Sequence, residues 1–144
     1  MDCVESRGNG RIICYDPKTN KTKTIIRNLK FANGVCVTKD CQSILFAETF
    51  GMKVSRYWFE GPKKGTTEVI MDNIPGYPDN INRASDGNYW LALVGMRGPA
   101  LDLALTLPDF RKRMSRRINT SNWLFPNINT CLLYTSDAAD DVYC

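Results

Sequence analysis

The feature that most limits the fold of this chain is a pattern that occurs twice, 46 residues apart. In the first copy Asn33-Gly-Val-Cys-Val precedes Ile44-Leu-Phe-Ala, and in the second Asp79-Asn-Ile-Asn-Arg precedes Trp90-Leu-Ala-Leu. Each copy reads as two short strands joined by a turn that contains aspartate. Repeats of about 40–50 residues with several short strands are typical of propeller blades. Since two copies are few, a β-sandwich built from hairpins is the alternative.

Most of residues 10–95 read as short strands separated by turns. Apolar or alternating runs bounded by Pro, Gly, Asn and Asp predict strands and the turns between them. The predicted strands are Arg11–Tyr15, Thr22–Ile26, Gly34–Thr38, Ser43–Ala47, Lys53–Phe59, Thr67–Met71, Asn80–Arg83 and Tyr89–Val94. The sequence therefore predicts an all-β fold, with its blades within residues 1–95.

The composition changes after Met96. Leu101–Leu107 and Phe110–Ile118 are rich in Leu and Arg at helical spacing, and Pro108 suits the first turn of the second helix. We predict a helical and loop insertion over residues 96–130. A basic amphipathic helix can contact a membrane surface or a partner, although such runs more often form a solvated face. The run lacks interleaved aromatic residues, so no nucleic-acid partner is expected.

The last residues do not read as part of a fold. Cys131–Asp141 resembles, codon by codon, the frame translation of a transposase-type sequencing adapter. We therefore predict that residues 131–144 are a translated adapter and lie outside the domain, with a genuine acidic tail as the alternative. A strand pattern begins ten residues after Met1 with no signal-peptide pattern before it. We expect the chain to be a piece of a longer protein.

The absence of histidine excludes several kinds of site from this segment. Without His there is no Ser-His-Asp triad, no Cys-His pair and no His general base. Leaving out residues 131–144 raises the formal net charge from +4 to +7. Four cysteines then remain, Cys3, Cys14, Cys36 and Cys41, and their spacing matches no zinc-binding pattern. Cys14 and Cys36 lie in strand-like runs and are expected to be buried free thiols, with a disulfide as the alternative.

Three oxygen donors occupy matching places in the two copies of the repeat. Asn33, Asp79 and Asn80 carry the amide and carboxylate oxygens that a hard cation such as Ca²⁺ prefers. In adjacent blades they could point into one channel, although Ca²⁺ takes about six to eight oxygens, more than these three supply. The alternative is turn chemistry, because Asn tolerates positive φ and Asx side chains cap turns.

Two further groups are expected to be structural. Glu48 ends a strand pattern, and we expect it to bond the backbone or Arg56 rather than to act as an acid. The aromatic residues Tyr57, Trp58 and Trp90 are expected to pack between blades.

Seven stretches, in order, closely resemble the strictosidine synthase-like family, which includes the adipocyte plasma membrane-associated protein. They are Gly10–Pro17, Phe31–Val35, Ala47–Thr49, Arg56–Trp58, Gly61–Thr66, Pro75–Ile81 and Asp86–Trp90. The resemblance covers residues 5–118. It implies a partial six-bladed β-propeller, of which this chain would supply about two to three blades, with a short helical C-terminal segment.

That family is related to paraoxonases, gluconolactonases and regucalcin, which hold a calcium or other divalent ion on the propeller axis. By resemblance, Asn33, Asp79 and Asn80 map onto ligand positions, and a further Glu and Asn would come from blades outside this chain. The implied activity is metal-assisted, arylesterase-like hydrolysis of an ester or lactone. The segment alone is expected to be inactive and to bind the ion weakly.

The resemblance also leaves other functions open. A non-catalytic propeller could act as a binding scaffold, secreted or anchored to a membrane. A strictosidine synthase-type enzyme would condense an amine with an aldehyde in alkaloid biosynthesis without a metal. The expected partner is therefore a small ester, lactone or alkaloid-type molecule, with membrane association of the parent protein. The compartment stays open among endomembrane, vacuole, cell exterior and membrane surface.

Overall fold

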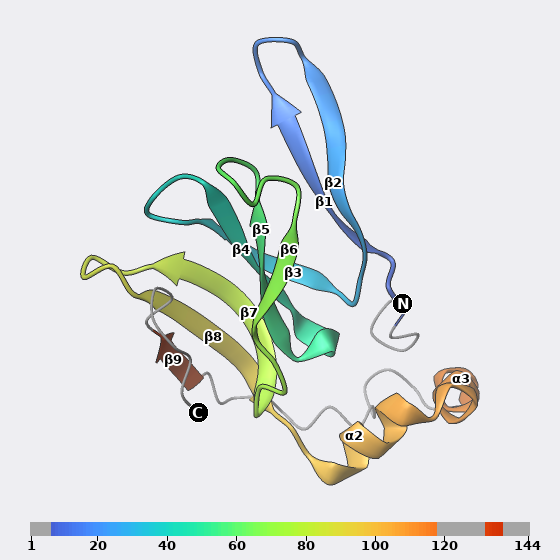
Figure 1. The fold of residues 1–144 in the computed structure, drawn as a ribbon. Coiled ribbons are helices and arrows are strands. Elements are labelled where there is room, and N and C mark those ends of the chain that lie inside the picture. Colours follow the sequence, from blue (N-terminus) through green and yellow to red (C-terminus); the bar gives the residue numbers. More distant parts are fainter. Residues whose placement is uncertain (1–6, 118–131, 137–144) are drawn as a thin grey trace.

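A computed structural model describes residues 7–117 and 132–136 of the chain. Its strands form three antiparallel sheets in which neighbours in the chain are neighbours in space (Figure 1). The first sheet holds β1 (Gly10–Asp16) and β2 (Lys21–Leu29); the second holds β3 (Ala32–Val37), β4 (Ser43–Glu48), β5 (Lys53–Trp58) and β6 (Thr67–Met71); the third holds β7 (Gly76–Arg83), β8 (Tyr89–Met96) and β9 (Leu132–Ser136). All eight strands predicted from the sequence are present.

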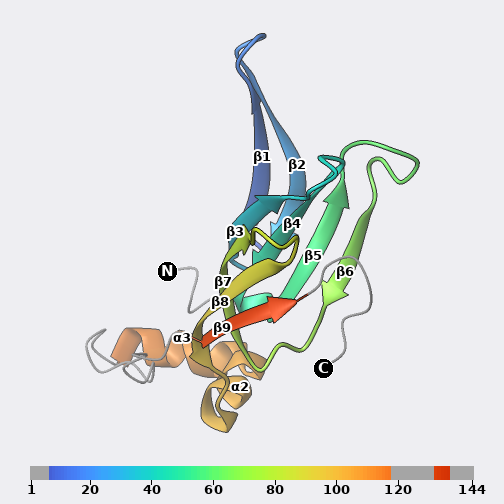
Figure 2. The ribbon, with the colours of Figure 1, turned by 90° about the vertical axis from the view of Figure 1, so that its left-hand side faces the viewer.

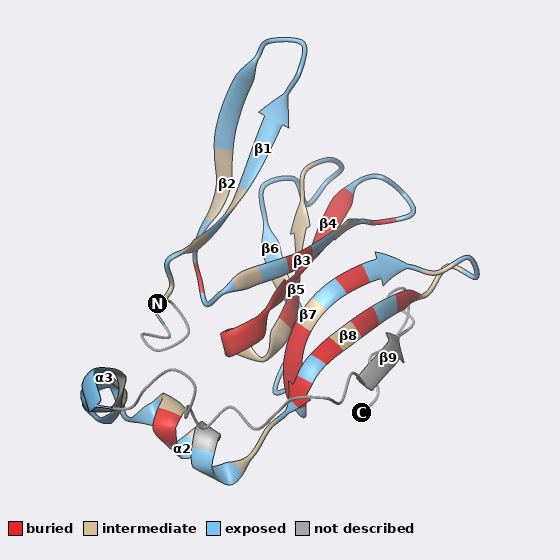
Figure 3. Cartoon of the chain, turned by 180° about the vertical axis from the view of Figure 1, so that it is seen from behind, coloured by how far each residue is buried: buried red, intermediate tan, exposed pale blue. Residues whose placement is uncertain are grey.

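The core lies between the second and third sheets. Strand β8 alternates strictly, with Tyr89, Leu91 and Leu93 buried and the residues between them more exposed, as Figure 3 shows. The cluster also contains Leu45, Ala47, Val54, Met71, Ile74 and Ile81. Because β3 packs beside β7, the first strand of each sheet lies at the junction between them. The second sheet is thus one complete four-stranded blade, flanked by strands of two neighbouring blades.

Two helices and one short turn of helix complete the described residues. The 3₁₀ turn η1 (Thr49–Gly51) follows β4, and α2 (Pro99–Thr106) and α3 (Pro108–Arg117) follow β8. Each α-helix begins with proline, as predicted at Pro108, because an N-terminal N–H has no intrahelical partner to lose. Figure 2 shows both helices beyond one end of the sheets. In the part of the chain that the structure describes, neither helix is long and apolar enough to cross a membrane.

Electrostatic contacts hold the helices in place. Arg97, at the end of β8, pairs with Asp102 at 3.1 Å and donates to Asn73 Oδ1 at 2.5 Å. Arg111 donates to the carbonyls of Ala104 and Leu105 in the last turn of α2. The helical C-terminal segment is therefore anchored to the connection that precedes β7. Whether basic α3 meets a membrane stays a prediction.

Two of the packing expectations are wrong, and of the two alternatives expected for Glu48 it bonds the backbone and not Arg56. Cys14 is exposed, because no other described element covers the faces of the two-stranded sheet β1–β2; Cys36 is only partly buried, and both are free thiols. Trp90 is 44% exposed, since it lies on the face of β8 that points away from the core. Arg56 does not bond Glu48 but donates to Ser43 Oγ and stacks 3.8 Å above the centre of the Trp58 ring.

Strand β9 falls inside the stretch that resembles an adapter translation. It pairs with β8 from Tyr89↔Ser136 to Leu93↔Leu132. An open strand edge offers unpaired backbone N–H and C=O groups to any extended segment. The pairing therefore does not bear on the origin of residues 131–144, and their assignment stays a prediction.

Candidate functional site

Matching β-bulges occur in the first strand of each of the two repeated hairpins. On β3, Asn33 and Gly34 lie between the pairs Ala32↔Glu48 and Val35↔Phe46, so two residues face one on β4. On β7, Asp79 and Asn80 lie between Pro78↔Leu93 and Ile81↔Leu91, which again sets two residues against one. Bulges redirect side chains and are frequent near functional sites. The 46-residue repeat thus aligns the predicted ligands through the same irregularity.

The two bulges touch each other at Gly34. A Cβ atom on Gly34 would lie 2.3 Å from the carbonyl oxygen of Asp79 and 2.8 Å from the Cα of Asn80. Only glycine permits this approach, because any side chain would displace the neighbouring backbone. Asn33 is therefore adjacent to the residue that contacts Asp79 and Asn80, and the structure brings all three predicted residues to one junction.

Thr49 fixes the orientation of the Asn33 side chain. Asn33 Nδ2 donates to Thr49 Oγ1 at 3.2 Å, and this hydroxyl donates to the Pro78 carbonyl at 2.7 Å. Thr49 is 4% exposed, so its two hydrogen bonds link β3, η1 and β7 inside the protein. Because the amide nitrogen is the donor, Oδ1 remains as the acceptor that a cation would need. The sequence prediction did not single out Thr49; its only signal was a polar residue directly after a strand.

The oxygen donors of the junction have no partners within residues 7–117 and 132–136. No hydrogen bond or ion pair with a described residue engages Asn33 Oδ1, the Asp79 carboxylate or the Asn80 amide. Asp79 is half-buried, whereas Asn33 and Asn80 are exposed. Because Asp79 is only half-buried, its carboxylate stays accessible to solvent and to a cation. The donor set is compatible with part of a cation site.

Glu48, by contrast, is occupied. Its Oε2 accepts the backbone N–H of Lys30 at 2.7 Å, and its Oε1 pairs with Lys53 at 3.2 Å. The side chain is 5% exposed. The expected structural role of Glu48 is confirmed, with Lys53 in place of Arg56 as its cationic partner.

A row of aromatic rings packs beneath the junction. Phe31 and Phe50 meet edge to face at 5.3 Å, and Phe50 meets Tyr77 at 6.2 Å. The Tyr77 hydroxyl is buried without a hydrogen-bond partner among the described residues. Burial, followed by the nearby Asp102 carboxylate, raises the pKa of this phenol. The row thus connects Phe31, two residues before Asn33, with Tyr77, two residues before Asp79.

The described residues hold only part of a cation site. They contain no cluster of three or more His, Cys, Asp or Glu side chains, and the junction has a single carboxylate. Ca²⁺ takes about six to eight oxygen ligands. Asn33, Asp79 and Asn80 fit such an ion by donor type but not by number, so other segments of a complete protein would have to supply the rest.

Comparisons with known proteins agree with this architecture. The family profile described as strictosidine synthase matches residues 1–62. Strictosidine synthase-like protein 13 of Arabidopsis thaliana is 38% identical over 108 residues, which cover 75% of this chain and 27% of that protein. The adipocyte plasma membrane-associated protein of Salmo salar is 39% identical over 94 residues, which cover 65% of this chain and 23% of that protein. The chain spans about a quarter of the length of these relatives.

Solved structures share the fold. A luciferin-regenerating enzyme superposes with a TM-score of 0.52 at 21% identity, covering 60% of this chain and 30% of that one. A regucalcin of Agrobacterium tumefaciens, described as a calcium-binding protein, superposes with a TM-score of 0.51 at 22% identity and the same coverage. The predicted fold class, a partial β-propeller with a short helical segment, is confirmed. The chain belongs to the strictosidine synthase-like family, of whose propeller it forms a part.

Proposed function

We propose that the full-length protein is a metal-assisted hydrolase of small esters or lactones, in which Asn33, Asp79 and Asn80 supply part of the ligand set for Ca²⁺ or another divalent cation. The observation that carries this proposal is the pair of matching bulges in contact at Gly34. They bring three oxygen-bearing side chains from two blades to one place. Among the described residues, Asn33 Oδ1, the Asp79 carboxylate and the Asn80 amide have no hydrogen-bond or ion-pair partner, whereas Asn33 Nδ2 donates to Thr49.

The chemistry of the donors supports a catalytic rather than a purely structural ion. Two of the three ligands are neutral amides, so the net ligand charge stays low and a substrate oxygen can still compete for coordination. A cation bound there would polarise an ester or lactone carbonyl. The protein contributes orientation: Thr49 holds the Asn33 amide, and the bulge fixes the Asp79 backbone against Gly34. The calcium-binding description of the regucalcin with this fold points the same way.

The test is a calorimetric titration of full-length, metal-depleted protein with CaCl₂, followed by an assay of phenyl acetate hydrolysis. Asp79→Asn removes the only charge of the junction. We expect calcium affinity to fall by at least about tenfold, which corresponds to the loss of one charge-assisted contact. The matched control Asp72→Asn removes an exposed carboxylate outside the bulge and should leave affinity unchanged.

The outcomes separate the candidate functions. Calcium binding with calcium-dependent hydrolysis supports the proposal. Calcium binding without hydrolysis of any ester or lactone would make the propeller a binding scaffold. If the full-length protein condenses an amine with an aldehyde and a chelator does not abolish this activity, the protein would be a metal-free enzyme of the strictosidine synthase type. If Asp79→Asn and wild type bind calcium equally, the three residues are turn residues and the proposal is wrong.

A further inference from the structure

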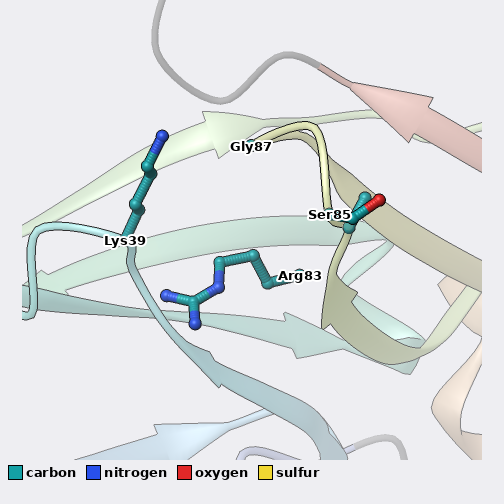
Figure 4. Close-up of a pocket in the computed structure, with 5 residues that line it drawn as sticks. Lys39, Arg83, Ser85 and Gly87 are labelled. Atoms are coloured by element: carbon teal, nitrogen blue, oxygen red, sulfur yellow. The ribbon is translucent and has the colours of Figure 1, made fainter.

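A basic pocket lies between the turns that close the two repeated hairpins. It has a volume of about 630 Å³ and is lined by Lys39, Arg83, Ala84, Ser85 and Gly87. Figure 4 shows Lys39 extending from the β3–β4 turn and Arg83 from the end of β7, with Ser85 and Gly87 on the β7–β8 turn. The lining therefore comes from two adjacent blades, both of which are described.

A buried hydroxyl holds the two walls of this pocket together. The Tyr89 side chain, 5% exposed, accepts the backbone N–H of Lys39 through its hydroxyl oxygen at 3.3 Å. Tyr89 begins β8 and pairs with Arg83, so this bond ties the β3–β4 turn to the strand that carries the other cation. The pocket is thus preorganised, which lowers the entropic cost of binding a ligand.

Gly87 keeps the pocket open on the side of the second turn. Its φ is +102°, a conformation that L side chains rarely adopt, and a Cβ there would lie 3.8 Å from Lys39 Nζ. The ammonium group of Lys39 therefore reaches across to the β7–β8 turn. A side chain at this position would be strained by the positive φ, whereas its Cβ would be in ordinary van der Waals contact with Lys39 Nζ.

The acidic residues of both turns are used elsewhere. Asp40 accepts hydrogen bonds from Thr38 Oγ1 and the backbone N–H of Gln42 and pairs with Arg56 at 3.5 Å. Asp86 accepts both the backbone N–H and the side-chain amide of Asn88, each at 3.0 Å. Within the described part of the chain, neither Lys39 nor Arg83 has an ion-pair partner. The pocket therefore presents two cations that form no ion pair with a described residue, although the hydrogen-bonded Asp86 carboxylate of the same turn keeps its negative charge.

We propose that this pocket binds a small molecule through a phosphate or sulfate group. A guanidinium can donate two parallel hydrogen bonds to such an oxyanion, and the lysine ammonium adds a point charge from the opposite wall. The volume lies within the range of small-molecule sites, so it accommodates more than a bare ion. In this proposal the oxyanion contacts Lys39 and Arg83 beside the glycine-containing β7–β8 turn.

This anion pocket is separate from the cation junction. Asn33 lies in the first part of β3 and Lys39 just after its end, six residues further along. At roughly 3.3 Å per residue this is about 20 Å along the chain, and on β7 Arg83 lies three residues, about 10 Å, beyond Asn80. The two sites share no residue, and the test of the pocket is made without calcium, so it does not depend on the proposed hydrolase centre.

The test is calorimetric titration of the full-length protein with sodium phosphate and sodium sulfate, without calcium and at an ionic strength held constant with NaCl. We expect saturable binding of both anions by the wild type. Lys39→Gln/Arg83→Gln should weaken it by at least about tenfold, because two charge-assisted contacts are lost. The control Lys18→Gln/Lys21→Gln removes the same charge from the exposed β1–β2 turn and should bind as the wild type does.

Circular dichroism verifies that each variant is folded, which the exposure of Lys39 and Arg83 favours. The proposal is overturned if the wild type shows no saturable response beyond that to chloride. It is equally overturned if the control loses as much affinity as the pocket variant, because the effect would then reflect net charge rather than a site.

Discussion

Strands β3 and β7 lie side by side, yet their two ends differ in geometry and in charge. At the bulge end the backbones approach so closely that only Gly34 fits, and the side chains that emerge offer oxygen acceptors. At the turn end a pocket opens between the strands, and the groups that line it are cations. The same 46-residue repeat thus builds an acceptor site at one end and a donor site at the other. The close approach at the bulge end depends on Gly34, which has no side chain, whereas at the turn end the long side chains of Lys39 and Arg83 line the space between the blades.

Gly34→Ala should have the largest effect, because it breaks the close approach. The added methyl would lie 2.3 Å from the Asp79 carbonyl oxygen, so one blade must shift. We expect a loss of about 3 kcal/mol in the free energy of unfolding, measured by urea denaturation of the full-length protein. Gly98→Ala is the control, since nothing lies within 4 Å of its Cβ position. Equal stability of the two variants would show that β3 and β7 are not in contact.

Thr49→Val tests the hydrogen bonds that orient the bulge end. Valine preserves the shape of threonine but leaves the Asn33 amide and the Pro78 carbonyl without their shared partner. We expect a loss of about 2 kcal/mol in the free energy of unfolding, together with weaker calcium binding. Thr106→Val, at an exposed hydroxyl that bonds the Leu103 carbonyl, should cost only a few tenths of a kcal/mol. A Thr49 variant as stable as the Thr106 variant would contradict the network.

Two tyrosine substitutions test whether the Tyr89 hydroxyl stabilises the turn end. Tyr89→Phe removes the hydroxyl that accepts from Lys39 and should cost about 1 kcal/mol in a thermal unfolding experiment. Tyr77→Phe removes a buried hydroxyl that has no partner among the described residues, so the same change should be neutral or stabilising. If the two substitutions changed the stability equally, the hydrogen bond from the Lys39 N–H to the Tyr89 hydroxyl would not stabilise the fold.

The parts of the fold that follow local rules were predictable from the sequence. Turn residues and alternation predicted strands β1 to β8, and Pro108 marked the start of α3. The junction of Asn33 with Asp79 and Asn80 followed from aligning the repeats. The bulges could not be predicted, because they depend on the register between paired strands, which the sequence pattern of a single strand does not specify. The sequence analysis missed the roles of Thr49 and Tyr89 and the shared pocket of Lys39 and Arg83 for the same reason. Each depends on segments that are distant in the chain and close in space.

The smallest expected effect concerns Asp40, the carboxylate of the β3–β4 turn. A hydrogen bond from Thr38, with smaller help from the Gln42 N–H and Arg56, lowers its pKa below the ordinary 3.8, against partial desolvation. A lowered folded-state pKa gives stability that is complete above the unfolded value and disappears as pH falls through the folded value. Asp40→Asn should therefore flatten the decline of the melting temperature below about pH 4. The effect should be only a few tenths of a kcal/mol, since the side chain is 42% exposed. Asp72→Asn removes an exposed carboxylate that no arginine contacts in the described residues, and it provides the reference curve. If both variants decline as steeply as the wild type, the contacts within the turn do not lower the pKa of Asp40, and its hydrogen bond from Thr38 contributes nothing to stability in acid.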